Sequence, residues 1–133
     1  MSHTPEVVQT YLQKVGEQDV DGIVALFADD IDWLVPGDPA LPWIGARHRR
    51  DELADYFRTL WSHFVAGQSR VELGKIVIDG PDAVVLASFD HVVARNGRPF
   101  HTEVAMHVTV ADGRITVMHL YEDTHIVSQA MAA

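Results

Sequence analysis

The sequence predicts a single α+β domain in which helices cover one face of a curved, mostly antiparallel sheet. Helical patterns fill the first half of the chain, whereas every segment after Arg70 has the composition of a strand. The last three strands are separated by Asn96-Gly97 and Asp112-Gly113, two strong hairpin-turn signals. The 133 residues have the length of one domain, so we assign residues 1–133 to one unit.

Two amphipathic helices are predicted at the start of the chain. The first begins at Thr4, with Pro5 where a helix tolerates proline, and ends at Gly16. The second begins at Asp19, whose carboxylate can cap a helix, and stops at Asp29-Asp30. The apolar residues of each helix recur at helical spacing: Val8, Tyr11, Leu12 and Val15 in the first, and Ile23, Leu26 and Phe27 in the second.

A strand, a proline-rich loop and a third helix are expected next. The strand runs over Ile31–Val35, and residues 36–42 form a loop that either closes over a pocket as a lid or packs on the edge of the core. The third helix runs from about Arg50 to Val65. One face of it carries Leu53, Phe57, Leu60, Trp61 and Phe64.

Four strands are predicted after this helix, at Arg70–Ile78, Ala83–Arg95, Phe100–Ala111 and Arg114–Val127. If both hairpins have two-residue turns and no bulge, the pairing of the last three strands is fixed. The interior face of the last strand then carries alternate residues, which change from apolar to ionisable: Ile115, Val117, His119, Tyr121, Asp123 and His125. The outer face would carry Met118, Leu120 and Glu122, with Glu122 beside Asp90 and Glu103.

The polar end of this predicted interior face is the candidate catalytic site. Asp123 could act as a general base, because an apolar wall raises the pKa of a carboxyl group, and His91 and Thr102 from the same row could orient it. Tyr121 and His119 could donate hydrogen bonds to a developing enolate oxygen. The catalytic candidates are therefore Asp123, His91, Tyr121 and His119.

Ten further side chains are expected to contact a substrate. They lie on the predicted interior face, on the third helix or in the loop above it: Trp33, Trp43, Phe57, Trp61, Phe89, Phe100, Thr102, Val104, Met106 and His125. Aromatic residues at helical spacing are also typical of an ordinary core.

Two alternatives remain open for the same residues. Asp123 and His91 could form a buried ion pair that only holds the rim of the sheet. His91, Asp123 and His125 could also approximate a metal site, although their spacing is a weak signal and hydrogen-bonded imidazoles are the ordinary interpretation. We expect no metal and no cofactor.

Composition restricts the class of partner. The formal net charge of −9 repels the phosphate backbone of nucleic acids. No apolar run is long enough to span a membrane, and the N-terminal residues lack the pattern of a signal peptide, so we expect a cytoplasmic protein. The chain has no cysteine, which excludes disulfides and thiolate nucleophiles.

Three segments resemble the NTF2-like superfamily, in particular SnoaL-like and ketosteroid-isomerase-related proteins: GDPALPWIGARHRRDELADYF, HTEVAMHVTVADGRI and HLYEDT. The resemblance implies a cone of three N-terminal helices packed on a strongly curved sheet around an apolar cavity. It also implies a homodimer formed through the outer face of the sheet. Isomerases, polyketide cyclases, dehydratases, epoxide hydrolases and non-catalytic binding proteins share this fold, which therefore does not select one reaction.

The resemblance also bears on the choice of catalytic base. Asp123 matches the aspartate of the family's final-strand pattern Tyr-x-Asp-Thr, near which cyclases place their base, whereas the ketosteroid-isomerase pattern would use Asp32. His119 and Arg49 stand where the family often has arginine and glycine. The sequence thus predicts an acid–base isomerase or cyclase for a small, apolar carbonyl compound, or a non-catalytic protein that binds a hydrophobic ligand.

Overall fold

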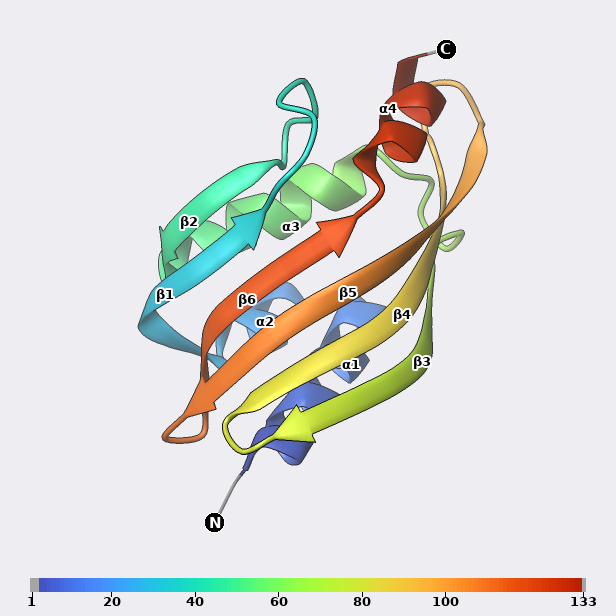
Figure 1. The fold of residues 1–133 in the computed structure, drawn as a ribbon. Coiled ribbons are helices and arrows are strands. Elements are labelled where there is room, and N and C mark those ends of the chain that lie inside the picture. Colours follow the sequence, from blue (N-terminus) through green and yellow to red (C-terminus); the bar gives the residue numbers. More distant parts are fainter. Residues whose placement is uncertain (1–2, 133) are drawn as a thin grey trace.

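The computed structural model describes residues 3–132, which form one six-stranded mixed sheet and four α-helices (Figure 1). The strand order is β2-β1-β6-β5-β4-β3, and β1 and β6 pair in parallel while the other neighbours pair antiparallel. The elements are α1 (Thr4–Glu17), α2 (Val20–Val24), β1 (Phe27–Val35), β2 (Gly45–Arg49), α3 (Leu53–Ser62), β3 (Arg70–Asp79), β4 (Asp82–Val92), β5 (Pro99–Ala111), β6 (Arg114–Glu122) and α4 (Thr124–Ala132). The predicted α+β class is confirmed.

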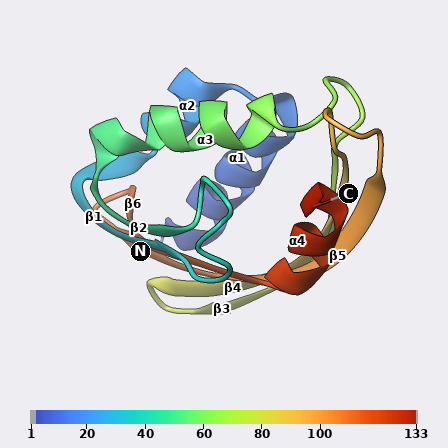
Figure 2. The same ribbon diagram turned by 90° about the horizontal axis from the view of Figure 1, so that it is seen from above.

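The helices lie on the concave side of the bent sheet (Figure 2). The prediction of three N-terminal helices is wrong in detail, because only α1 and α2 precede the first strand and α3 follows β2. The fourth helix, α4, occupies residues that the sequence predicted to extend the last strand. β6 ends at Glu122 because the Asp123 carboxylate accepts a hydrogen bond from the His125 backbone N–H at 3.1 Å, as a helix cap does.

Local sequence signals explain the other helix boundaries. Asp19 caps α2 by accepting a hydrogen bond from the Gly22 backbone N–H at 3.0 Å. The third helix is shorter than predicted, because a 3₁₀ turn over Arg50–Glu52 leads into α3. Phe27 begins β1 instead of ending the second helix.

The β4–β5 hairpin has a longer turn than the sequence predicted. The Val93 backbone N–H donates to the Arg98 carbonyl at 2.8 Å, which leaves four residues between them. Pairing therefore shifts by two residues, so that His91 lies opposite Phe100 and Phe89 opposite Thr102. The predicted pairs are therefore wrong. A register shift of two residues nevertheless keeps every side chain on its predicted face, so Thr102 remains on the interior face.

The β5–β6 hairpin contains a β-bulge that reverses the faces of most of β6. Val110 pairs with Ile115, but the preceding residue, Thr109, pairs with Val117, so Thr116 is an extra residue. Beyond this bulge Met118 and Leu120 are buried, whereas Tyr121 is 48% exposed. The prediction that His119, Tyr121 and Asp123 line the interior is therefore wrong, and Glu122 takes the interior position.

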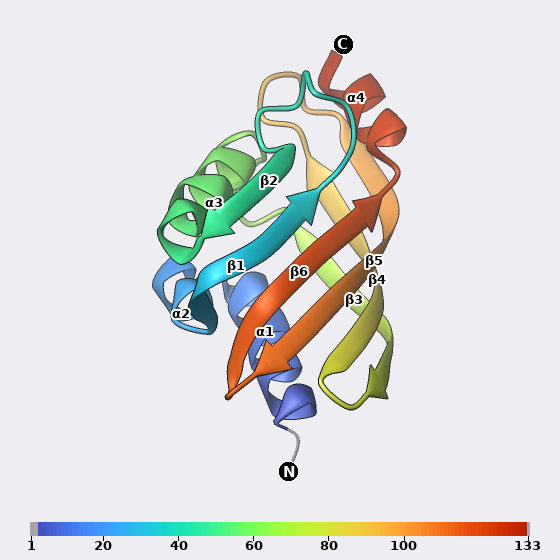
Figure 3. The ribbon, with the colours of Figure 1, turned by 60° about the vertical axis from the view of Figure 1, so that its left-hand side comes forward.

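Helix α4 is held at both ends by loops and covers one end of the concave face (Figure 3). At its start, the Thr124 hydroxyl accepts a hydrogen bond from the Asp38 backbone N–H at 3.3 Å, and in its middle the Ser128 hydroxyl donates to the Asp38 carboxylate at 2.6 Å. Near its end, the Asn96 side chain of the β4–β5 turn donates to the Ala130 carbonyl at 2.8 Å. In the β1–β2 loop, Leu41 and Trp43 are buried, which favours packing on the core over an open lid.

No helix within residues 3–132 has the length and apolar character needed to cross a membrane.

Deletion of Thr116 tests the bulge. Without the extra residue, the pairs Val110–Ile115 and Thr109–Val117 become consecutive, so Met118 and Leu120 keep their buried positions. We expect the deletion to change the free energy of unfolding by less than about 2 kcal/mol, measured by urea denaturation. Thr116→Ala keeps the residue count and should cost less than about 1 kcal/mol. A loss of more than about 4 kcal/mol on deletion, with Thr116→Ala unaffected, would contradict a bulge at Thr116.

Candidate functional site

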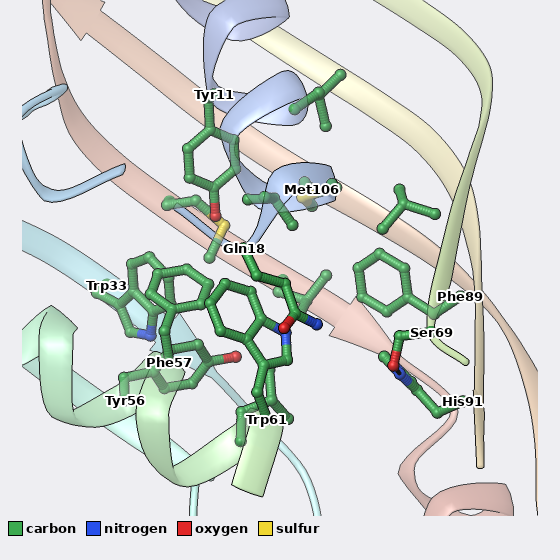
Figure 4. A pocket seen from close by; sticks show the side chains of 17 residues that line it. Tyr11, Gln18, Trp33, Tyr56, Phe57, Trp61, Ser69, Phe89, His91 and Met106 are labelled. Carbon is green, nitrogen blue, oxygen red and sulfur yellow. Dashed lines mark hydrogen bonds between the residues drawn. The ribbon is translucent and has the colours of Figure 1, made fainter. Parts of the chain in front are cut away.

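A small aromatic pocket lies between the concave face of the sheet and helices α1 and α3 (Figure 4). Its volume is about 60 Å³. Most of its wall is apolar, and six of the predicted site residues line it: Trp33, Phe57, Trp61, Phe89, His91 and Met106. Their contact with a substrate stays a prediction, but the structure brings these six side chains together.

A second, smaller cavity of about 20 Å³ lies next to this pocket, and we call it the inner compartment. Tyr56, Leu60, Phe89, His91 and Leu120 line both spaces and form the partition between them. The inner compartment is also lined by two predicted contact residues, Trp43 and Phe100, and by the carboxyl-bearing Glu122.

His91 is held in the partition by β4, with 8% of its surface exposed. Its ring stacks on Phe64, with centroids 4.2 Å apart and an interplanar angle of 11°. Its Nδ1 lies 2.8 Å from the Ser69 hydroxyl. Burial lowers the pKa of His91 to about 4, so the ring is neutral at pH 7. A neutral imidazole can donate from one nitrogen and accept at the other.

Glu122 is the functional candidate that the sequence reasoning missed. Thr102 is 1% exposed, and its hydroxyl donates a hydrogen bond to the Glu122 carboxylate at 2.5 Å. Burial raises the pKa of Glu122, and the nearby charge of Asp123 adds to this rise. The sequence contains one signal for this position. The apolar residues Met118 and Leu120 alternate with His119 and Tyr121, and this apolar pair lies in the interior only if a bulge precedes it.

Two tyrosines supply hydroxyl groups to the pocket. The hydroxyls of Tyr11, from α1, and Tyr56, from α3, point toward its interior (Figure 4). Burial raises the pKa of both groups, and the charge of Glu122 raises the pKa of Tyr56 further. The Arg47 guanidinium lies 5.1 Å from the centre of the Tyr56 ring and opposes that rise. Both hydroxyls are therefore neutral donors at pH 7.

Trp33 adds an indole N–H at the same wall. The residue is 1% exposed, and its Nε1 has no hydrogen-bond partner within residues 3–132. Its ring packs edge-on against Tyr56 at a centroid distance of 4.7 Å. This contact fixes the position of the Tyr56 ring.

The other predicted site residues lie away from the pocket. His119 and the alternative base Asp32 are together on the outer side of the sheet, where His119 Nε2 is 2.9 Å from Asp32 Oδ1 without the alignment of a hydrogen bond. Tyr121 is exposed near His119. Asp123 and His125 are exposed at the start of α4.

The remaining predictions concern Val104 and a metal. Val104 is buried in the core but lines neither cavity. The alternative metal set is dispersed, because His91 is buried in the partition while Asp123 and His125 are exposed. Within residues 3–132, no three or more histidine, aspartate or glutamate side chains are arranged to hold a metal ion.

A bent sheet and helices that enclose an aromatic pocket on its concave face define the NTF2-like class of proteins, and solved structures agree with this fold. An NTF2-like protein of unknown function from Burkholderia pseudomallei K96243 superposes with a TM-score of 0.90 at 22% identity over 100% of both chains. TerC, co-crystallised with polyporic acid, gives 0.87 at 18% identity over 98% of each chain. IdmH from Streptomyces antibioticus, a candidate polyketide cyclase, gives 0.77 at 18% identity over 98% of this chain and 99% of its own.

The family is shown by the sequence itself. The family model described as the SnoaL-like domain matches residues 8–118, and the chain belongs to this family. No protein of curated function matches the chain. The predicted superfamily is therefore confirmed, while the identities of 18% and 22% to these three structures support the fold alone.

The half-buried Glu122 predicts a specific dependence of stability on pH. Because its pKa is raised from 4.5 on folding, the folded state holds this proton more tightly than the unfolded chain does. The resulting stability is complete below pH 4.5 and is lost as the pH rises through the folded-state pKa. Glu122→Gln has no titrating proton at this position and does not lose this stability. The free energy of unfolding of Glu122→Gln minus that of wild type should therefore increase as the pH rises through the folded-state pKa of Glu122.

Urea denaturation of both proteins at a series of pH values measures this difference. His91, whose pKa burial lowers from 6.5 to about 4, destabilises the fold as the pH falls through that range. It does so in both proteins, so its effect cancels in the comparison. A difference that stays constant with pH would show that the Glu122 carboxyl is not buried.

Proposed function

We propose that the pocket and inner compartment bind a small, mostly apolar carbonyl compound and move a proton on it by acid–base catalysis, as an isomerase or cyclase does. The observation that carries this proposal is the half-buried Glu122 carboxyl, which Thr102 holds in a compartment that Tyr56 also lines. A carboxylate with a raised pKa is a stronger base, and a neutral tyrosine is a hydrogen-bond donor.

The proposed step begins with the ionised Glu122 carboxylate. It removes a proton from the carbon next to the carbonyl group, the C–H electron pair forms the enolate, and the carbonyl oxygen takes the negative charge. The Tyr56 hydroxyl stabilises that oxygen by donating a hydrogen bond. The protonated Glu122 then returns its proton to a different carbon of the same molecule, which completes an isomerisation. In a cyclisation, the enolate carbon instead attacks a second carbonyl group and closes a ring, and Glu122 gives its proton to the alkoxide oxygen that forms.

Surrounding residues support these roles physically. Thr102 directs one carboxylate oxygen, leaving the other available to the compartment. Arg47 opposes the rise of the Tyr56 pKa that burial causes, which makes the hydroxyl a better donor. TerC and IdmH, with this fold, are described in connection with polyporic acid and polyketide cyclisation, and both descriptions are compatible with carbonyl-bearing ligands.

Solvent deuterium exchange into 1-tetralone tests the proton transfer, with the label followed by mass spectrometry. Glu122→Gln should slow the protein-catalysed exchange about 100-fold or more, because it removes the proton acceptor. Quenching of tryptophan fluorescence should show that the Kd for 1-tetralone differs less than about threefold between Glu122→Gln and wild type. The matched control is Asp123→Asn, which alters the adjacent, exposed carboxylate. It removes only the smaller contribution to the raised pKa of Glu122 and should slow exchange less than about threefold. Loss of exchange in Asp123→Asn instead would assign the base to Asp123.

Non-catalytic binding is the second candidate function, and the largely apolar wall of the pocket favours it. In this case 1-tetralone would bind to the wild-type protein and to Glu122→Gln equally, with no catalysed exchange in either. The same pair of measurements therefore separates the two functions.

We also propose that the chain forms a homodimer through the face of the sheet opposite the helices. That face carries an apolar patch of four exposed side chains, which we call the outer patch: Val77, Val84, Leu86 and Tyr121, each 38–48% exposed. Val84 pairs with Val77 on β3, and Leu86 and Tyr121 both pair with Ala105 on β5, so the patch is continuous. Exposed apolar patches of this kind favour association with another protein surface.

Leu86→Arg tests the dimer, because it places a charge in the middle of the outer patch. Sedimentation velocity should show at least a tenfold weaker dimer, which corresponds to about 1.4 kcal/mol. Gln13→Arg, on the exposed side of α1, adds the same charge away from the sheet and should leave the dimer intact. A monomeric wild-type protein at micromolar concentration would exclude the dimer.

A further inference from the structure

We propose that Gln18 controls which molecules enter the pocket, an inference that rests on the ligand-binding function proposed above. Gln18 follows the last residue of α1, and its side chain lies across the pocket beside Trp61 of α3 (Figure 4). It lines the pocket and is also exposed to solvent, so it stands at the mouth.

The backbone conformation of Gln18 is the first support for this role. Its φ of 54° and ψ of 37° are left-handed, a conformation that costs free energy for residues with a β-carbon and that glycine or asparagine usually adopts at this position of a helix. Strain of this kind is often associated with a functional position. A glutamine here places a longer amide side chain over the pocket than either common residue would.

The chain on both sides of Gln18 fixes the direction of its side chain. The Gln18 backbone N–H donates to the Val15 carbonyl at 3.0 Å, and the Asp19 N–H donates to the Lys14 carbonyl at 3.0 Å. The Asp19 carboxylate then caps α2. The short connection between α1 and α2 is thus anchored at both ends, and the Gln18 side chain is directed toward Trp61.

The small pocket volume is the second support. A space of about 60 Å³ holds only a few water molecules, so a ligand has to displace part of the wall. Tyr11 and Phe57 are 3% exposed and tightly packed. The Gln18 side chain, in contrast, is exposed, and no hydrogen bond to its amide joins it to the rest of residues 3–132. It is the side chain at the mouth that can move at the least cost.

The chemistry of the mouth follows from its two side chains. The Gln18 amide offers both a donor and an acceptor, and the Trp61 indole offers a donor. A ligand whose outer end carries a hydroxyl or carbonyl group can hydrogen-bond to this pair. A bulky apolar end would instead be excluded by the glutamine, so the position selects against large molecules.

Fluorescence titration with a two-ring ketone, 1-tetralone, and a four-ring ketone, progesterone, tests this selection. The measured quantity is the ketone ratio, which is the Kd for progesterone divided by the Kd for 1-tetralone. We expect this ratio to be at least about tenfold lower for Gln18→Gly than for wild type, and both ketones to associate faster with the variant. Gln18→Asn keeps an amide on a shorter side chain and should give an intermediate ratio. Gln13→Ala, on the exposed side of α1, is the control for a change of glutamine elsewhere on the helix.

Thermal unfolding separates a purely structural role from the proposed one. Gln18→Gly relieves the left-handed strain and should raise Tm under either role. A raised Tm with an unchanged ketone ratio and unchanged association rates would overturn the role of Gln18 while leaving the ligand-binding function intact. If neither wild type nor Gln18→Gly binds either ketone, both proposals fail. Binding by Gln18→Gly alone would support Gln18 as the barrier at the mouth.

Discussion

The position of one extra residue in β6 determines the chemistry of the concave face. Thr116 interrupts the pairing of β5 and β6, and every later side chain of β6 exchanges faces relative to an uninterrupted hairpin. Two large apolar side chains, Met118 and Leu120, are buried as a result, and their burial provides the free energy that selects the bulged register. The same shift brings a carboxyl group, Glu122, to the interior.

The site combines this carboxyl group with donors from helices on the opposite wall. Glu122 could not be accommodated among aromatic rings without a partner, and Thr102 supplies one hydrogen bond from the neighbouring strand. Tyr56 comes from α3, and its ring is positioned by Trp33 and Arg47. Helix α4 closes the inner compartment with Val127 and is anchored by loops at both ends. The proposed acid–base pair therefore depends on contacts between elements that are distant in sequence.

Much of the fold was predictable because local signals agree with it. Asp19 marked the second helix, and Asp112-Gly113 marked a hairpin whose first pair, Ala111 with Arg114, forms as predicted. The interior aromatic residues were also found, because Trp61 and Phe89 follow simple periodicity. The bulge and α4 have weaker signals. The alternation of Met118 and Leu120 with His119 and Tyr121 indicates the bulge only indirectly, because Thr116 itself is an ordinary strand residue, and His125–Val127 is as compatible with a strand as with a helix. The sequence therefore predicts Asp123 as the base, one residue from Glu122, which lies half-buried on the interior face.

The most direct test of this account is the ionisation of Glu122 itself, followed by carbon-13 NMR of its side-chain carboxyl group during a pH titration. Because its position on the interior face raises the pKa of Glu122, we expect a midpoint above 4.5, the ordinary value for glutamate, together with nuclear Overhauser contacts between the side chains of Glu122 and Thr102. A midpoint at the ordinary value, with no contact to Thr102, would place Glu122 on the outer face and contradict both the bulged register and the proposed site.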